Sequence, residues 1–342
     1  MNNYNNILII QTAYAGDVIL TLPMVQVLKK SYPEAEISFL CIPSTKNLVE
    51  NSIFIKEIIV YDKRGKQKGL FKFLNLIKEI KNSKYDLIIS PHRSLRSTLI
   101  SYLSKVKETV SFDESSFSFL YKHKVEYISN IHEILRNLSL LNPLGIKEKE
   151  IIAPELFISN EDKIVVNKIL EKFNIGDEKF ITIAPGTVWN TKMYPEEKIS
   201  KLVKLINESN IKIVMIGGEE DAGLCGMIIF LSKCKNVFNA AGKLSLLQSA
   251  ELIRRSNLLI TNDSAPLHLA NAVGTKVIAI FGATIPEFGF YPFREGDKII
   301  QTMGLKCRPC GIHGGYKCPI KTFDCMNKIQ EVDILEEVLR SI

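Results

Sequence analysis

The chain has 342 residues, of which 46% are apolar and 24% are charged, and its formal net charge is +7. This composition is typical of a soluble globular protein of about two domains. No apolar run approaches the ~18 residues of a membrane span, and neither a nucleic-acid-binding motif nor a dense basic stripe occurs. We therefore expect neither a transmembrane segment nor a nucleic-acid partner.

The N-terminal stretch MNNYNNILII lacks a basic region and a small-residue cleavage site, so we expect no signal peptide and a cytoplasmic location. In that compartment the cysteines should be reduced or bind metal. Most of the excess positive charge lies in the first 155 residues. An acidic ligand or an anionic surface would explain it, and so would a merely lysine-rich surface.

In the first part of the chain, short apolar runs alternate with amphipathic stretches. Runs 6–11, 36–41, 56–62 and 85–90 predict buried strands, a helix begins near Asp17, and residues 70–83 predict another helix. This alternation is typical of a parallel sheet with helices on both faces.

The stretch 141–156 contains two prolines, a glycine and a charge cluster, which indicates a linker. The pattern then restarts with strands at 179–186, 211–218, 257–263 and 276–282, and an amphipathic helix over 328–342 ends the chain. We therefore predict an α/β protein with two Rossmann-like domains, 1–155 and 156–327. The last helix is expected to pack back toward the N-terminal domain. Ligands of such sheets bind at the carboxyl ends of the strands, here in the cleft between the two domains.

Asp17 follows Gly16 at the end of the first predicted strand, where a helix starts. An aspartate at this position can be a plain helix N-cap. In a cleft it can instead act as a general base, since a carboxylate accepts a proton from a substrate hydroxyl.

The second half places polar groups at three successive strand ends. Thr187 and Lys192 follow one strand, and a hydroxyl with an ammonium suits phosphate oxygens. Glu219 follows the next strand and could accept hydrogen bonds from a ribose, although an acidic residue also stabilises a helix start.

The third strand end reads TNDSAPLHLA and carries Asp263, Ser264 and His268. A helix start offers free N–H groups and a partial positive charge, which suit an anion. His268 alone could equally be a core histidine. Together the three loops outline a nucleotide-diphosphate site.

Several common nucleotide and metal motifs are missing. No G-x-G-x-x-G follows the first strand and no Walker A sequence occurs, which argues against dinucleotide redox chemistry and P-loop chemistry. No Asp-x-Asp pair is present to hold a divalent metal, so a lysine and a helix dipole would stabilise the diphosphate.

Four cysteines near the C-terminus have the spacing C-x₂-C-x₇-C-x₆-C: Cys307, Cys310, Cys318 and Cys325. This spacing is compatible with a structural zinc ion. Reduced thiols or a disulfide are the alternatives, and we otherwise expect neither a metal nor a cofactor.

Four segments, ILIIQTAYAGDVILTLPMVQVLKKSYPEAEISFL, IAPGTVWNTKMYPEEKISKLV, IGGEED and TNDSAPLHLANAVGTKVIAIFGAT, resemble glycosyltransferase family 9, the heptosyltransferases of lipopolysaccharide core synthesis. The resemblance covers nearly the whole chain in order. The cysteine-bearing tail is similar to the branch that adds the second heptose.

The resemblance implies a GT-B fold and an inverting, metal-independent transfer from ADP-L-glycero-D-manno-heptose. It implies that Asp17 is the general base, that Lys192 and Thr187 contact the diphosphate, and that Glu219 contacts the ribose. Asp263, Ser264, Ala265 and His268 would line the diphosphate and heptose site.

The implied acceptor is Kdo-lipid A or a heptosylated core, reached at the inner face of the cytoplasmic membrane. Arginines suit its carboxylates and phosphates because they pair with them bidentately. The candidate acceptor residues are Arg93, Arg96, Lys63, Arg64, His132 and Arg136, the last two of which could instead pair with local carboxylates.

Three alternatives stay open at this point. One is the same chemistry with another nucleotide-sugar, for an O-antigen or capsule glycan. A non-catalytic nucleotide-sugar-binding protein would not need Asp17, and an epimerase of the same two-domain fold would not need Arg93 and Arg96.

Overall fold

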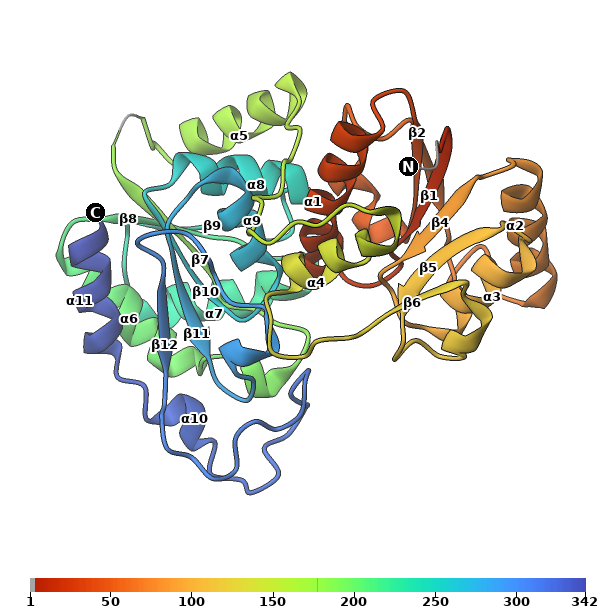
Figure 1. Cartoon of the computed structure of the whole chain (residues 1–342). Coiled ribbons are helices and arrows are strands. Elements are labelled where there is room, and N and C mark those ends of the chain that lie inside the picture. Colours follow the sequence, from red (N-terminus) through yellow and green to blue (C-terminus); the bar gives the residue numbers. More distant parts are fainter. Residues whose placement is uncertain (1–3, 177) are drawn as a thin grey trace. The chain divides into compact units, whose positions relative to one another are not determined.

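The computed structural model describes residues 4–176 and 178–342 (Figure 1). The chain divides into two compact units, Met1–Phe157 and Ile158–Ile342. Each unit is built around one parallel sheet of six strands. No helix within the described ranges combines the length and the apolar character needed to cross a bilayer.

The first sheet has the strand order β3-β2-β1-β4-β5-β6. Its central strands are fully buried on both faces, which is why they are runs of Ile and Leu without polar alternation. Its strands are β1 (Asn6–Ile10), β2 (Glu36–Cys41), β3 (Glu57–Val60), β4 (Leu87–Ser90), β5 (Glu108–Phe112) and β6 (His123–Val125).

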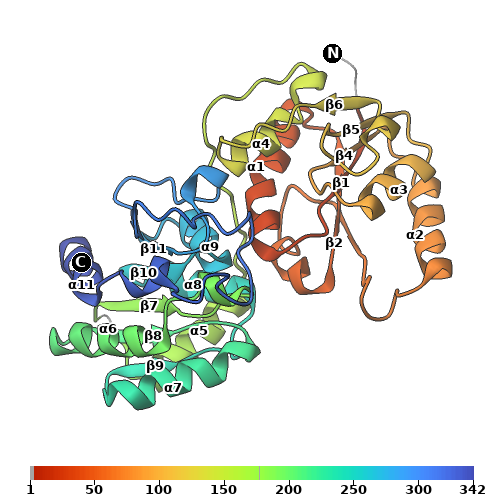
Figure 2. The ribbon, with the colours of Figure 1, turned by 90° about the horizontal axis from the view of Figure 1, so that it is seen from below.

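Helices cover both faces of this sheet (Figure 2). Helices α1 (Ala15–Ser31) and α4 (Glu133–Ser139) pack together on one face, while α2 (Leu70–Asn82) and α3 (Leu95–Leu103) lie on the other. Three short 3₁₀ turns complete the unit: η1 (Pro43–Leu48), η2 (Ser118–Leu120) and η3 (Asn142–Leu144).

The second sheet has the strand order β12-β11-β10-β7-β8-β9. Its strands are β7 (Phe180–Ala184), β8 (Lys212–Met215), β9 (Val237–Asn239), β10 (Leu258–Asn262), β11 (Val277–Phe281) and β12 (Lys298–Gln301).

One face of this sheet carries α5 (Asn160–Lys172), α8 (Leu246–Arg255) and α9 (Ala265–Val273), and the other carries α6 (Glu196–Glu208), α7 (Ala222–Ser232) and α11 (Glu331–Ser341) (Figure 1). The remaining short elements are η4 (Asn190–Lys192), η5 (Glu219–Asp221), η6 (Pro286–Phe288) and α10 (Asp324–Asn327).

The α/β architecture with two parallel sheets is confirmed, and every predicted strand is present, with ends that differ by at most three residues. The expectation for the last helix is wrong. Helix α11 packs on α6 and buries Ile334 and Val338 in the core of the second unit, because its apolar stripe continues that core.

Candidate functional site

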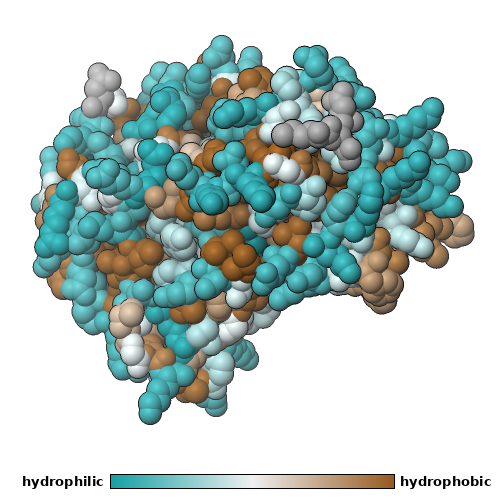
Figure 3. Space-filling model, viewed as in Figure 1, coloured by the Kyte–Doolittle hydropathy of each residue, from teal (hydrophilic) through white to brown (hydrophobic). Residues whose placement is uncertain are grey.

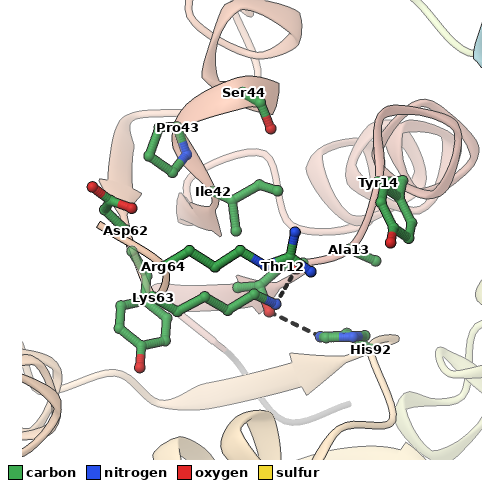
Figure 4. A pocket seen from close by; sticks show the side chains of 11 residues that line it. Thr12, Ala13, Tyr14, Ile42, Pro43, Ser44, Asp62, Lys63, Arg64 and His92 are labelled. Atoms are coloured by element: carbon green, nitrogen blue, oxygen red, sulfur yellow. Dashed lines mark hydrogen bonds between the residues drawn. The ribbon is translucent and has the colours of Figure 1, made fainter. Parts of the chain in front are cut away.

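The carboxyl edge of the first sheet contains a pocket of about 450 Å³ (Figure 4). The loops that follow β1, β2, β3 and β4 supply its walls, as the parallel topology requires. The lining residues are Thr12, Ala13, Tyr14, Ile42, Pro43, Ser44, Tyr61, Asp62, Lys63, Arg64 and His92.

Lys63 and Arg64 give this pocket its positive charge. The Lys63 ammonium donates a hydrogen bond to the Thr12 carbonyl at 2.8 Å, and Figure 4 shows the Arg64 side chain lying beside it. Burial lowers the pKa of Lys63, with further lowering by the charges of Arg64 and Arg96. The cations therefore repel one another, so an anionic group in the pocket would be stabilising.

His92 lies beside Thr12 in the same pocket and is neutral at physiological pH. Its Nδ1 is 2.9 Å from the Thr12 hydroxyl and 3.1 Å from the Ser97 hydroxyl. Burial lowers the pKa of His92 to about 4, helped by Lys63 and Arg93. A neutral imidazole offers one donor and one acceptor, so His92 is suited to a sugar hydroxyl.

Asp17 lies in the first turn of α1, half-buried, and its carboxylate accepts a hydrogen bond from the backbone N–H of Tyr14 at 3.1 Å. Tyr14 itself lines the pocket. A second carboxyl group, Glu133 of α4, is close enough that the Asp17 charge helps to raise its pKa. Burial is the main cause and outweighs the adjacent Arg136, so the pKa of Glu133 rises to about 7.

The predicted acceptor arginines have different surroundings. Arg93 forms an ion pair with Glu114 at 2.6 Å and stacks on the ring of Tyr127, so a ligand would have to compete for it. Arg96, at the start of α3, is exposed, and its charge reaches Lys63 in the pocket. Of the two, Arg96 is the better placed for an anionic ligand.

His132 and Arg136 have structural roles, and we leave them out of the acceptor site. The His132 ring caps α4 by accepting from the Ile134 N–H at 3.2 Å. Arg136 is only 1% exposed, pairs with Glu133, and donates to three backbone carbonyls, those of Ile128, Ser129 and Ile131. These partners satisfy a charge that is costly to bury alone.

In the second unit, Lys192 and Asp263 come together at the carboxyl edge of the sheet. Their side chains form an ion pair at 2.6 Å, and both are mostly buried. Asp263 also accepts a hydrogen bond from the Thr284 hydroxyl at 2.6 Å. The loops that follow β7, β10 and β11 are thus joined around one lysine ammonium.

Helix α9 starts directly after Asp263. The Ser264 side chain does not cap the helix, and Pro266 occupies its first turn. The first turn therefore keeps the backbone amides and partial positive charge that favour an anion. Ser264 and Ala265 are half-buried at this start, while His268 is buried one turn further on, with its ring edge-on to Phe290.

Thr187 and Glu219 lie on neighbouring loops. The Thr187 hydroxyl donates to the Trp189 carbonyl at 2.7 Å, so it shapes its own loop. Glu219 is exposed in η5. Between them, Asp221 accepts from the Gly218 N–H at 2.9 Å and fills the space beside Gly186, where any Cβ would overlap it.

The cysteine-rich segment 303–325 packs against the loop that carries Lys192. Thr191 and Gly315 form two hydrogen bonds, backbone to backbone at 2.9 Å and N–H to hydroxyl at 2.7 Å. The rings of His313 and Tyr316 lie against Trp189. This segment therefore fixes the backbone from which Lys192 projects.

The four cysteines line one small pocket together with Arg308. They are free thiols. Within the described part of the chain, no three His, Cys, Asp or Glu side chains are arranged to hold a metal ion. The four thiols share a pocket but do not converge as metal ligands, so the zinc site that their spacing allowed is not supported by the structure.

Sequence reasoning missed several residues that organise these sites. Asn262 accepts from the Tyr194 N–H and donates to the Pro185 carbonyl, which ties the β7 loop to β10. Thr284 holds Asp263, and Glu133 lies near Asp17. The only signal for Asn262 was its place in the TNDS motif, and nothing local marked Thr284 or Glu133.

Comparison with known proteins gives a consistent result. The family model described as glycosyltransferase family 9 (heptosyltransferase) matches residues 73–314. Lipopolysaccharide heptosyltransferase 3 of Escherichia coli K12 is 28% identical over 299 residues, covering 84% of this chain and 85% of that protein.

Two solved structures share the fold of the whole chain. A family 9 glycosyl transferase from Veillonella parvula has a TM-score of 0.87 at 22% identity, covering 99% of this chain and 98% of that chain. The Escherichia coli ADP-heptose lps heptosyltransferase II has a TM-score of 0.79 at 18% identity, with 98% of each chain covered. The fold is therefore of the GT-B class.

Proposed function

Since this chain belongs to glycosyltransferase family 9 and is a heptosyltransferase, we propose that it transfers L-glycero-D-manno-heptose from ADP-heptose to the inner core of lipopolysaccharide. We propose an inverting reaction that needs no metal ion. The observation that carries the proposal is the Lys192 ammonium, held by Asp263 at the uncapped start of α9, because a lysine and free helix amides at one place can stabilise the charge of a leaving diphosphate.

On this proposal the second unit binds the donor. The Lys192 ammonium and the first amides of α9 contact the diphosphate, with Ser264 and Ala265 at the same helix start. Asp263 holds Lys192 in place, and Glu219 accepts from the ribose hydroxyls. Thr187 supports the loop between them, and His268 lines the heptose side.

The first unit binds the acceptor and carries the general base. Asp17 removes the proton from an acceptor hydroxyl while that oxygen bonds to the anomeric carbon of heptose. The bond from that carbon to the phosphate oxygen breaks on the opposite face, so the configuration inverts and ADP leaves with the electron pair. A carboxylate in this role contributes roughly 10²–10⁴-fold to the rate.

The cationic pocket suits the carboxylates of Kdo-lipid A or the phosphates of a heptosylated core. Lys63 and Arg64 line it, Arg96 stands at its side, and Arg93 can join once it is released from Glu114. Since such an acceptor is anchored in a bilayer, the enzyme would work at the inner face of the cytoplasmic membrane.

The test is a transfer assay with purified protein, ADP-heptose and Kdo-lipid A or heptosylated core, in excess chelator. We expect release of ADP and an acceptor heavier by one heptose, with the anomeric configuration inverted by NMR. Transfer only from a UDP-sugar, or a strict need for divalent metal, would contradict the proposal.

A further inference from the structure

Helix α2 has more apolar surface than its core needs. Its buried face consists of Phe73, Leu76, Ile77 and Ile80, which have the i, i+3, i+4, i+7 spacing of one helical face. Leu70, Phe71 and Leu74 lie outside that face and are 69%, 85% and 45% exposed. An exposed Phe beside two exposed Leu has no role in the fold, which indicates an interaction site.

The loop before α2 is basic and contains internal hydrogen bonds. The Asp62 carboxylate accepts from the N–H groups of Gly65 and Lys66 at 2.8 and 2.7 Å, and the Gln67 side chain accepts from the Asp62 N–H at 2.7 Å. These bonds fold residues 62–67 into a compact turn. The basic residues of this loop are therefore held in a defined turn and do not belong to an unstructured charged segment.

Four cations lie next to the exposed apolar residues of α2 in the sequence: Arg64, Lys66, Lys68 and Lys72. All four are exposed, and no acidic residue lies between Asp62 and Glu79 in the sequence. A cluster of basic residues around exposed Phe and Leu is the pattern that binds an anionic bilayer surface.

The position of this cluster in the fold links it to the acceptor pocket. The loop 62–69 follows β3, and its first residues, Lys63 and Arg64, line the pocket. Two further exposed phenylalanines, Phe117 and Phe119, lie in the loop that joins β5 to β6. Figure 3 shows apolar side chains among hydrophilic ones in this region, where Figure 1 labels α2 and α3.

We propose that Leu70, Phe71 and Leu74, with Arg64, Lys66, Lys68 and Lys72, form a docking surface for an anionic lipid bilayer. This surface continues from the acceptor pocket through the loop 62–69, so docking would bring the pocket close to the bilayer in which the acceptor glycan is anchored. This reason for docking rests on the proposed function, whereas the docking itself is a separate property of the surface.

Another exposed apolar group provides a matched control. Met227, Phe230 and Leu231 lie in the second half of α7, and Phe230 is 75% exposed. Because α7 starts after the carboxyl end of β8 and runs back along the sheet, its last turn lies toward the opposite edge from the donor loops.

The test is co-flotation of the full chain with vesicles that contain no glycan, made of phosphatidylcholine alone or with phosphatidylglycerol. We expect binding to the anionic vesicles that falls with added salt and is at least tenfold weaker for Leu70→Ser/Phe71→Ser. Lys66→Glu/Lys68→Glu should weaken it similarly, while Phe230→Ser should bind like the wild type. Equal binding by Leu70→Ser/Phe71→Ser, or no binding by the wild type, would overturn the proposal.

Transfer to a deacylated, water-soluble acceptor separates docking from catalysis. Leu70→Ser/Phe71→Ser should transfer to this acceptor at the wild-type rate and lose rate only with a lipid-embedded acceptor. If the enzyme transferred no heptose but still bound anionic vesicles, the proposed function would fail and the docking surface would stand. A wild-type dimer that the Leu70→Ser/Phe71→Ser pair makes monomeric, without vesicle binding, would assign the surface to a second copy and overturn the proposal.

Discussion

Lys192→Ala would remove the ammonium that pairs with Asp263 at 2.6 Å near the start of α9. Two consequences follow from the structure. The donor diphosphate loses its lysine contact, and among the residues that the structure describes the Asp263 carboxylate keeps the Thr284 hydroxyl as its side-chain partner. The carboxylate then repels the same diphosphate that the ammonium attracted.

A hydrogen bond between charged groups contributes roughly 1.5–3 kcal/mol, and each 1.4 kcal/mol is tenfold in affinity. In the free protein Lys192 is already compensated by Asp263, which offsets part of the gain on binding. We therefore expect ADP affinity to fall by roughly 10–50-fold. Adding Asp263→Asn should recover part of that loss, because it removes the uncompensated carboxylate.

Calorimetric titration with ADP, without metal, measures both variants, and thermal melting shows that they are folded. UDP is the control nucleotide and should bind weakly to all of them. If Lys192→Ala bound ADP like the wild type, or if the double variant were weaker than the single one, the reasoning about this pair would be refuted.

Three further predictions concern the surroundings of the two sites. Gly314→Ala would put a Cβ 2.8 Å from the hydroxyl of Thr191, in the loop that carries Lys192, so ADP binding should weaken several-fold. Gly304→Ala is the control, because it has the same φ of +74 but no atom within 4 Å of the new Cβ, and it should lower only the stability of the fold. Calorimetric titration of both variants with ADP checks this. Lys63→Ala/Arg64→Ala should raise the KM for the acceptor by about tenfold and leave the KM for the donor unchanged, because both cations line the pocket of the first unit. Equal changes in the two KM values would contradict the assignment of this pocket to the acceptor. Burial raises the pKa of Glu133 to about 7, whereas the same carboxyl group in the unfolded chain loses its proton near pH 4.5. Between these two pH values the folded state binds a proton that the unfolded state does not, so the contribution of Glu133 to the free energy of unfolding falls as the pH rises. Glu133→Gln should therefore gain stability relative to the wild type by about 1–3 kcal/mol between pH 5 and 8 in urea titrations, and a constant difference would refute the shift.

The sequence predicts the sheets well because their buried strands are continuous apolar runs. It predicts the loops that carry Asp17, Lys192 and Asp263 for the same reason, since each follows such a run. Four strands were missed: β5, β6, β9 and β12. Strand β5 is buried, but its sequence ETVSF alternates polar and apolar residues and so forms no continuous apolar run. The other three are short edge strands. Their residues are only partly buried, so they have no apolar run to mark them.

Side-chain direction and long-range pairing could not be predicted. The spacing of His132 and Arg136 fits any face of α4, and only the structure shows that both point inward. Likewise, the pairing of Lys192 with Asp263 depends on β7 and β10 being neighbours in the sheet, although other strands separate them in sequence. The loops that carry the candidate residues could therefore be placed from the sequence, while the contacts between their side chains could not.

The central claim is that Asp17 is the general base of a heptosyl transfer. The most direct measurement is turnover of Asp17→Asn with ADP-heptose and its acceptor, beside ADP affinity measured on the same sample. We expect turnover to fall roughly 10²–10⁴-fold while ADP binds as in the wild type. Turnover within a few-fold of the wild type would contradict the claim, because the reaction would then not depend on this carboxylate.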